Sequence, residues 1–106
     1  MTLPFDNDSP DAAHTLRLAE VFRLLGEPNR LSLVYACLET PRSVQTLAAD
    51  IDISMSLASH HLRLLRSARL LRAERRGKQV FYVAADLHVQ RVLRDMATHG
   101  AKRDEP

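Results

Sequence analysis

The stretch that decides the fold is SMSLASHHLRLLRS, residues 54–67. Ser54 belongs to the residue types that cap helix N-termini, and apolar side chains follow it at the spacing of one helix face. That inner face consists of Leu57, Ala58, His61, Leu62 and Leu65. A shorter helical pattern begins at Ser43 and runs through Leu47 and Ala48, and residues 50–53 join the two patterns without a glycine. A short helix, a tight turn and a longer helix predict a helix-turn-helix.

Downstream of this motif the periodicity of the sequence changes. Apolar residues alternate with period two on either side of a basic tip at residues 75–78, which predicts a two-stranded hairpin. The alternating residues are Leu71, Ala73, Val80, Tyr82 and Ala84. Asp86 then suits the N-cap of a final helix, whose apolar stripe runs from Val89 to Met96.

Upstream, the sequence predicts two more helices. Ser9 and Pro10 suit the cap and first position of a helix that Gly26 ends. Pro28 starts a second helix, which Pro41 stops. The chain is therefore predicted to be mainly α with a small β-hairpin, a winged helix-turn-helix of about five helices and a two-stranded wing.

Length and composition indicate the class of protein. We expect the 106 residues to form one domain, with a core at about residues 10–100 and frayed ends. No apolar run approaches the roughly 18 residues that cross a bilayer. The acidic N-terminal stretch shows no secretory signal, and the lone Cys37 provides neither an internal disulfide nor a cysteine-pair metal site. We therefore expect a protein of the reducing cytoplasm that does not enter a membrane.

Positive charge is concentrated in the segment that carries the longer helix and the hairpin. Residues 1–52 have four cationic and eight acidic side chains, whereas residues 53–85 have seven cationic side chains and one acidic, Glu74. Such a segment is typical of a nucleic-acid surface, although charge alone fits a solvated face as well. The second helix of the motif would enter the major groove, unless its serines merely cap a helix in an unrelated all-α protein. The candidate DNA-binding residues are Ser54, Ser56, Ser59, His60, Arg63, Arg66, Arg75, Arg76 and Lys78.

Residues 53–66 resemble the recognition helix of the ArsR/SmtB family of metal-responsive repressors. Residues 25–31, LGEPNRL, are similar to the family's junction between its first two helices, and residues 75–82, RRGKQVFY, are similar to its wing. The similarity extends over about residues 15–100. It implies a homodimer built from the first and last helices, which binds a short palindromic operator in double-stranded DNA upstream of the genes it regulates.

The sensing sites of this family differ in position. An arsenic- or lead-sensing type has two cysteines before the third helix, where residues 40–46 of this chain contain none; Cys37 suits a core position instead. On the last helix, His88 and His99 are eleven residues apart, which places them on one face but about 16 Å apart along the axis. Each imidazole must lie about 2 Å from a bound zinc, so one helix cannot use both. Two antiparallel copies of the helix can, and the pattern predicts two symmetric sites in a dimer.

Asp86, His88 and His99 match the interface zinc site of the family's zinc-sensing branch. That branch usually has a fourth ligand three residues after the last histidine, where this chain has Lys102, and a protonated ammonium group cannot ligate. The alternatives for a fourth ligand are water, Asp104, Glu105 and His14. Nitrogen and oxygen donors favour zinc as the effector, with cobalt or nickel next, over copper(I) or lead.

We expect metal and DNA binding to oppose each other through a coupling free energy that acts in both directions. The resemblance implies that the second ring nitrogen of His99 is linked to the recognition helix near His60. An alternative is a member with a degenerate site, acting as a redox-responsive, partner-responsive or constitutive repressor. An enzyme is disfavoured, because Ser59, His60 and His61 point different ways from one helix and no glycine-rich phosphate loop is present. A pure protein-interaction module would leave the basic helix and wing unexplained.

Overall fold

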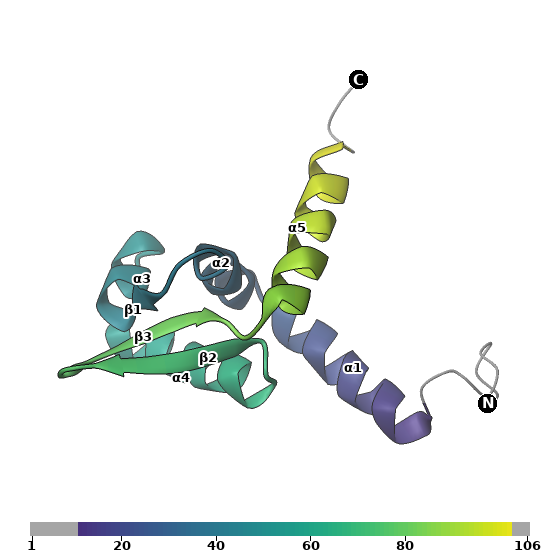
Figure 1. Ribbon diagram of the computed structural model, residues 1–106, viewed down its shortest axis with the longest axis horizontal. Coiled ribbons are helices and arrows are strands. Elements are labelled where there is room, and N and C mark those ends of the chain that lie inside the picture. The colour runs from purple at the N-terminus through teal and green to yellow at the C-terminus, as the bar shows by residue number, and fades with distance from the viewer. Residues whose placement is uncertain (1–10, 103–106) are drawn as a thin grey trace.

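The computed structural model describes residues 11–102 of the chain, with Lys102 described by its backbone only. In chain order the elements are α1 (Ala12–Leu25), α2 (Pro28–Ala36), β1 (Arg42–Ser43), α3 (Val44–Asp50), α4 (Met55–Ser67), β2 (Leu71–Arg76), β3 (Gln79–Ala84) and α5 (Leu87–Lys102). Helices α3 and α4 form the helix-turn-helix, and β2 and β3 form the wing (Figure 1). The predicted winged helix-turn-helix is confirmed.

The sheet has three antiparallel strands in the order β1-β3-β2. Arg76 lies opposite Gln79, so the turn of the wing consists only of Gly77 and Lys78. Gly77 has φ of 62°, the left-handed conformation that two-residue hairpin turns require and that glycine adopts without a steric cost. The short strand β1 was not predicted, because two residues are too few to show an alternating pattern.

The core lies between the sheet and helices α2, α3 and α4. Its fully buried large side chains are Leu33, Val34, Cys37, Leu47, Leu62, Leu65 and Leu71. Burying one such leucine contributes roughly 1.5–3 kcal/mol, so these contacts fix α4 against the body of the molecule. Cys37 is a core residue, as predicted.

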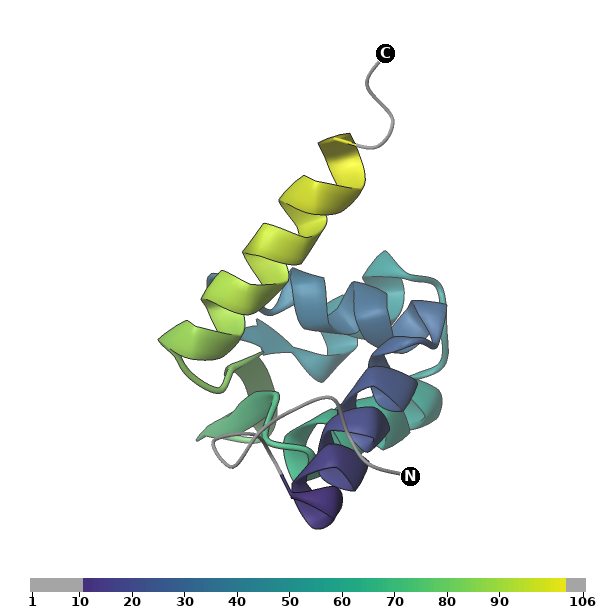
Figure 2. The same cartoon turned by 90° about the vertical axis from the view of Figure 1, so that its right-hand side faces the viewer.

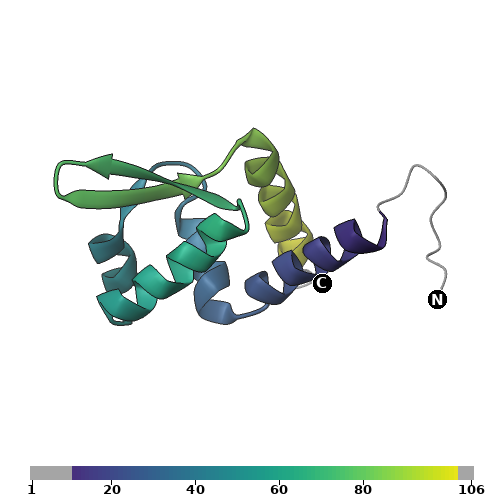
Figure 3. The ribbon, with the colours of Figure 1, turned by 90° about the horizontal axis from the view of Figure 1, so that it is seen from below.

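Helices α1 and α5 leave this body on the same side, and the tip of the wing lies at the opposite end (Figures 1 and 3). The two helices diverge from each other, which Figure 2 shows from the side. Several of their large apolar side chains are uncovered: Leu16 is 71% exposed, Phe22 67% and Met96 54%. None of the helices within residues 11–102 is long and apolar enough to span a membrane.

The start of α1 differs from the prediction. The N-cap is Asp11, whose carboxylate accepts a hydrogen bond from the His14 backbone N–H at 2.8 Å. Ser9 and Pro10, which were predicted to start this helix, lie outside the described residues. The cap is therefore an aspartate rather than the predicted serine, and both residue types accept this bond equally well.

Two predictions about α2 and α4 were wrong. Helix α2 ends at Ala36 rather than near Pro41, because the Cys37 carbonyl accepts a hydrogen bond from Ala84 of β3 instead of continuing the helix. Leu57 was predicted on the inner face of α4 but is 40% exposed. It lies about 100° around the helix from buried Ala58, at the edge of the inner face.

Candidate nucleic-acid interface and metal site

Helix α4, which is predicted to read DNA, has one buried and one exposed side. Ala58, Leu62 and Leu65 are buried against the core. Of the candidate DNA-binding residues on α4, Ser59 is half-buried and the others are exposed. The exposed residues are Ser54, Ser56, His60, Arg63 and Arg66. The polar and basic side of the helix is therefore open to a partner along its length.

The N-terminus of α4 is fixed by a cap and by an unusual turn. Ser54 Oγ accepts a hydrogen bond from the Leu57 N–H at 3.0 Å, as predicted. Asp52 has φ of 56°, and the backbone N–H of Ile53 reaches back to the Ala48 carbonyl at 3.0 Å. Aspartate is one of the few residues other than glycine that tolerate this left-handed conformation. The turn therefore needs no glycine.

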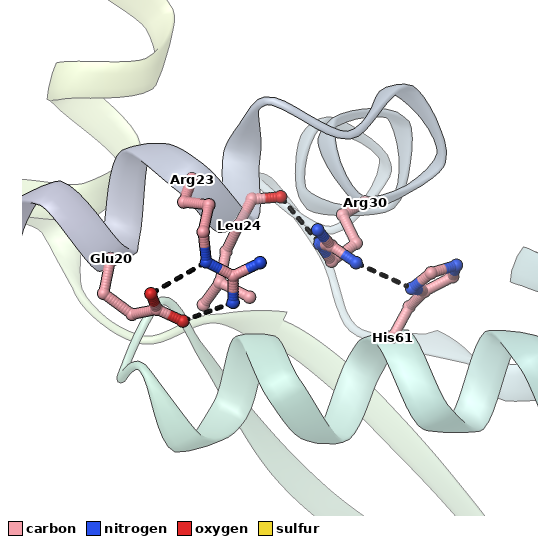
Figure 4. A network of polar contacts seen from close by, with 5 residues as sticks. All are labelled: Glu20, Arg23, Leu24, Arg30 and His61. Atoms are coloured by element: carbon pink, nitrogen blue, oxygen red, sulfur yellow. Dashed lines mark hydrogen bonds and ion pairs between the residues drawn. The ribbon is translucent and has the colours of Figure 1, made fainter.

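His61 joins α4 to the junction of α1 and α2 (Figure 4). Its ring is 7% exposed, and its Nδ1 lies 3.4 Å from Nη1 of Arg30. Because a guanidinium can only donate, Nδ1 must accept, and the ring proton is then on Nε2, which lies 3.9 Å from the Glu27 carboxylate. Arg30 Nε also donates to the Leu24 carbonyl at the end of α1, at 2.7 Å. Burial lowers the pKa of His61 by more than Glu27 raises it.

The wing presents its cations in two settings. Arg75 and Lys78 are exposed, and within residues 11–102 no ion pair engages them. Arg76 Nη2 instead lies 3.0 Å from the Glu74 carboxylate, and its guanidinium lies over the Phe81 ring, 4.8 Å from the centroid. The sequence showed these cations, but not that Glu74 engages one of the predicted DNA-binding residues.

An apolar groove of about 500 Å³ lies between α1, α2 and α5. Its lining includes the apolar residues Leu18, Phe22, Leu31, Val92 and Met96 and also His88. Uncovered apolar patches of this kind mark surfaces at which proteins associate. The groove and the basic side of α4 are thus separate surfaces of the molecule.

The predicted metal ligands lie at the two ends of α5. Asp86 caps the helix, as predicted, with one carboxylate oxygen accepting from the Val89 N–H at 2.9 Å. His88 follows in the first turn, and both side chains are exposed. His99 is exposed near the other end of the helix. Within residues 11–102 of one protomer, no three histidine, cysteine or carboxylate side chains come together as a metal site.

Polar contacts that the sequence did not reveal attach α5 to the body. Gln90 Nε2 donates to the Leu38 carbonyl at 2.8 Å, and Tyr35 Oη donates to the Leu93 carbonyl at 2.7 Å. Arg94 forms an ion pair with Glu39. These residues are 52 to 58 positions apart in the chain, so no local pattern could have predicted the contacts. These contacts therefore hold the first half of α5 against α2 and the segment before β1.

Cys37 has the properties of an inert core thiol. It is 0% exposed, and burial raises its pKa to about 12. The thiolate is the form that binds metals and reacts, so this cysteine is unsuited to either role.

Comparisons with known proteins agree with this architecture. The family described as "Bacterial regulatory protein, arsR family" matches residues 27–73. The transcriptional repressor SmtB homolog of Synechocystis sp. is 41% identical over 88 residues, which are 83% of this chain and 67% of that protein. The cadmium resistance transcriptional regulatory protein CadC homolog of Staphylococcus aureus is 34% identical over 83 residues, 77% of this chain and 69% of that protein. The chain spans only 62% of the HTH-type transcriptional repressor SmtB and 60% of the HTH-type transcriptional regulator KmtR, both from Mycobacterium tuberculosis.

A solved structure supports the fold independently. The homodimeric winged helix-turn-helix DNA-binding domain from Mycobacterium bovis superposes with a TM-score of 0.81, over 92% of this chain and 93% of that one, at 24% identity. The sequence matches establish the family, whereas the structural match establishes only the fold, because the sequence matches cover the helix-turn-helix and the wing together. The chain therefore belongs to the ArsR family of bacterial regulatory proteins, which are transcriptional regulators and not enzymes.

Proposed function

We propose that the protein is a homodimeric repressor that binds operator DNA through α4 and the wing. A divalent metal ion, with zinc as the first candidate, releases it from the DNA. The observation that carries this proposal is the separation of two surfaces. Helix α4 lies on the body with the wing, whereas α1 and α5 leave that body on the other side (Figures 1 and 3). Serines and arginines of α4 are exposed, and the apolar groove is lined mainly by residues of α1, α2 and α5. One surface suits DNA, and the other suits a second copy of the chain.

The proposed DNA contacts follow from exposure and position. Ser54, Ser56, Ser59 and His60 at the start of α4 suit base edges in the major groove, and the free N–H groups of the helix suit a phosphate. Further along the exposed side, Arg63 and Arg66 suit phosphates. Arg75, Arg76 and Lys78 of the wing contact the neighbouring backbone or minor groove. A protein that binds chromosomal DNA in this way acts in the cytoplasm.

The second copy is proposed to cover the groove between α1 and α5. Phe22 and Met96 are more than half exposed in one protomer, and burying such residues is the usual source of dimer stability. The relative of similar fold from Mycobacterium bovis is homodimeric. In the dimer the two copies of α4 would lie about 34 Å apart, the repeat of the major groove.

The proposed metal site combines Asp86 and His88 of one protomer with His99 of the other. These donors suit zinc, with cobalt or nickel next, because they are imidazole nitrogens and a carboxylate oxygen. The side chains are exposed at opposite ends of α5, so two antiparallel copies of α5 bring them together twice. The name of the Staphylococcus aureus relative, which refers to cadmium resistance, supports a metal effector in general.

Release is proposed to act through the attachment of α5 to the body. When bound, the metal supplies coordinate bonds between the two protomers. Gln90 and Tyr35 hold the first half of α5 against the body, so a change in the angle between the two α5 helices changes the spacing of the two α4 helices. The second ring nitrogen of His99 is proposed to reach the α4 region near His60, which adds a direct link.

The test is fluorescence anisotropy of the protein on a labelled fragment from upstream of its own gene, with zinc added at fixed salt. We expect release at about one zinc per protomer. Asp86→Asn keeps a good helix cap but weakens a ligand, so this variant should bind DNA and resist release. Asp95→Asn, at an aspartate that is also exposed and lies within α5, is the matched control and should respond like the natural chain.

The outcomes separate the alternatives. Release of the natural chain and of Asp95→Asn, but not of Asp86→Asn, supports the proposal and shows that Lys102 is tolerated. DNA binding that zinc, cobalt and nickel leave unchanged contradicts metal release and favours a redox-responsive, partner-responsive or constitutive repressor. Absence of binding to any DNA contradicts the repressor itself.

A further inference from the structure

The basic segment contains one carboxylate, and it lies in the wing. Among residues 53–85, Glu74 is the only acidic side chain beside seven cationic ones. It sits in the middle of β2, between Arg72 and Arg76, and alternate residues of a strand share a face. The three side chains therefore form a row along one face of the wing.

Glu74 engages both arginines at once. Its Oε1 lies 2.5 Å from Nη1 of Arg72, and its Oε2 lies 3.0 Å from Nη2 of Arg76. The Glu74 side chain is 26% exposed, whereas those of Arg72 and Arg76 are 55% and 56% exposed. The Glu74 side chain is thus less exposed than the two arginines, whose guanidinium groups hold the pKa of its carboxyl below the usual value.

The opposite strand fixes one of these arginines in place. Phe81 is directly across from Glu74 in the ladder, and the Arg76 guanidinium lies over its ring. Contact with an aromatic face and with a carboxylate favours this orientation of the guanidinium. A phosphate that approaches Arg72 or Arg76 must therefore compete with a carboxylate already bound there.

We propose that Glu74 limits the non-specific affinity of the wing for DNA. It occupies Arg72 and Arg76 until a well-placed phosphate displaces it, and in this way it contributes to the specificity of the protein for its operator. This inference rests on the proposed DNA-binding function. Phosphate contacts carry no sequence information, so cations that are open to any phosphate raise affinity for all DNA alike. Arg75 and Lys78, which no ion pair engages in the described part of the chain, keep that general attraction.

The experiment measures binding to a labelled duplex of random sequence over a range of salt concentrations, for the natural chain and for Glu74→Gln. Glutamine keeps the size of the side chain and removes its charge. We expect about five- to tenfold tighter binding and a steeper dependence of log K on log salt, by about 0.9 for each additional phosphate that the wing neutralises. Binding to the fragment from upstream of its own gene should tighten less, so the ratio of specific to non-specific affinity falls.

The matched control is Glu20→Gln. Glu20 pairs with Arg23 on α1, at the end of the molecule away from the wing, at 2.5 Å (Figures 3 and 4). This variant makes the same change in net charge and also releases an arginine from its ion pair, so it reports the effect of these two changes away from the wing. A second comparison introduces Glu74→Gln into a chain that already carries Arg72→Met and Arg76→Met. In that chain the substitution should leave the affinity for the random-sequence duplex unchanged. Exposed ion pairs contribute little to stability, so all these variants should fold.

Each result has one reading. Tightening by Glu74→Gln, but not by Glu20→Gln and not without the two arginines, supports the inference. If both glutamine variants tighten binding equally, or if the tightening persists without the arginines, Glu74 is not a specificity determinant, while the proposed DNA binding stands. If the natural chain binds no DNA, the proposed function fails and the inference fails with it.

Discussion

His61 is a buried, titratable side chain of α4, the helix that is proposed to read DNA. The groups that face it are Glu27 at the N-cap of α2, Arg30 within α2 and His60 from its own helix. Arg30 needs an accepting Nδ1, so the neutral ring is the form that fits. The residue therefore links the protonation state of one side chain to the packing of α1, α2 and α4 (Figure 4).

We expect this burial to make stability depend on pH. In the unfolded chain the imidazole titrates near 6.5, whereas burial lowers its pKa in the folded chain. Below pH 6.5 the unfolded chain takes up a proton that the folded chain does not, so the free energy of unfolding falls until the folded pKa is passed. The fall is at most about 1.4 kcal/mol for each pH unit. Urea denaturation between pH 7 and pH 5 measures it.

The variants that test this prediction are His61→Gln and His60→Gln. Glutamine at position 61 can still accept from Arg30 but does not titrate, so the fall between pH 7 and pH 5 should become smaller. His60 is the exposed neighbour, and His60→Gln should still show the decrease in the free energy of unfolding between pH 7 and pH 5. An unchanged pH dependence in His61→Gln would show that His61 is not its source.

At the scale of single elements, the N-terminus of α4 combines a structural and a proposed functional role. Ser54 caps the helix, whereas Ser56, two residues on, is exposed in its first turn. We expect Ser54→Ala to lower the free energy of unfolding by about 1 kcal/mol and Ser56→Ala to leave it unchanged. Both should weaken binding to the upstream fragment. Thermal unfolding and anisotropy on the same samples distinguish the roles; equal stability of the two variants would contradict the assignment of the cap.

Most elements could be predicted because their signals are local. The caps predicted at Ser54 and Asp86 were confirmed, and the helix predicted to begin at Ser43 has that serine as its N-cap, since an N-cap depends only on the residue and the N–H groups that follow it. The strand β1 was missed because its pairing with β3 depends on residues about 40 positions away. The turn at Asp52 carried no glycine signal, since aspartate adopts the left-handed conformation itself.

The candidate site also combines features that have a local sequence signal with features that have none. Charge and spacing in the sequence indicated which side chains of α4 and the wing are cationic, and the structure shows most of them exposed. The pairing of Glu74 with Arg72 and Arg76, and the contact of Gln90 with Leu38, could not be predicted, because each depends on the geometry of the folded backbone. The roles in DNA and metal binding remain predictions.

At the scale of the whole molecule, the proposal needs two protomers joined through α1 and α5. Phe22→Glu places a charge in the apolar groove at a position that is 67% exposed in one protomer, so the variant should fold but not dimerise. We expect its affinity for the upstream fragment to fall by about a hundredfold, because a monomer can no longer bind two half-sites of the DNA at once. Sedimentation measures the oligomeric state. Met55→Glu, at a 53% exposed apolar residue outside the groove, should remain a dimer; loss of dimers in both variants, or in neither, would contradict this interface.

Cobalt(II) absorption by a mixed dimer is the sharpest test of the proposed function, because the proposed site takes residues from two protomers. His88→Ala and His99→Ala each remove one ligand from both sites, so neither variant alone should show the spectrum of tightly bound cobalt. When the two variants are produced together, mixed dimers contain one site with His88 from one chain and His99 from the other. We predict that the spectrum returns in these samples, at one site per mixed dimer. If co-production restores no binding, or if either variant alone binds cobalt as the natural chain does, the shared site between two α5 helices is wrong.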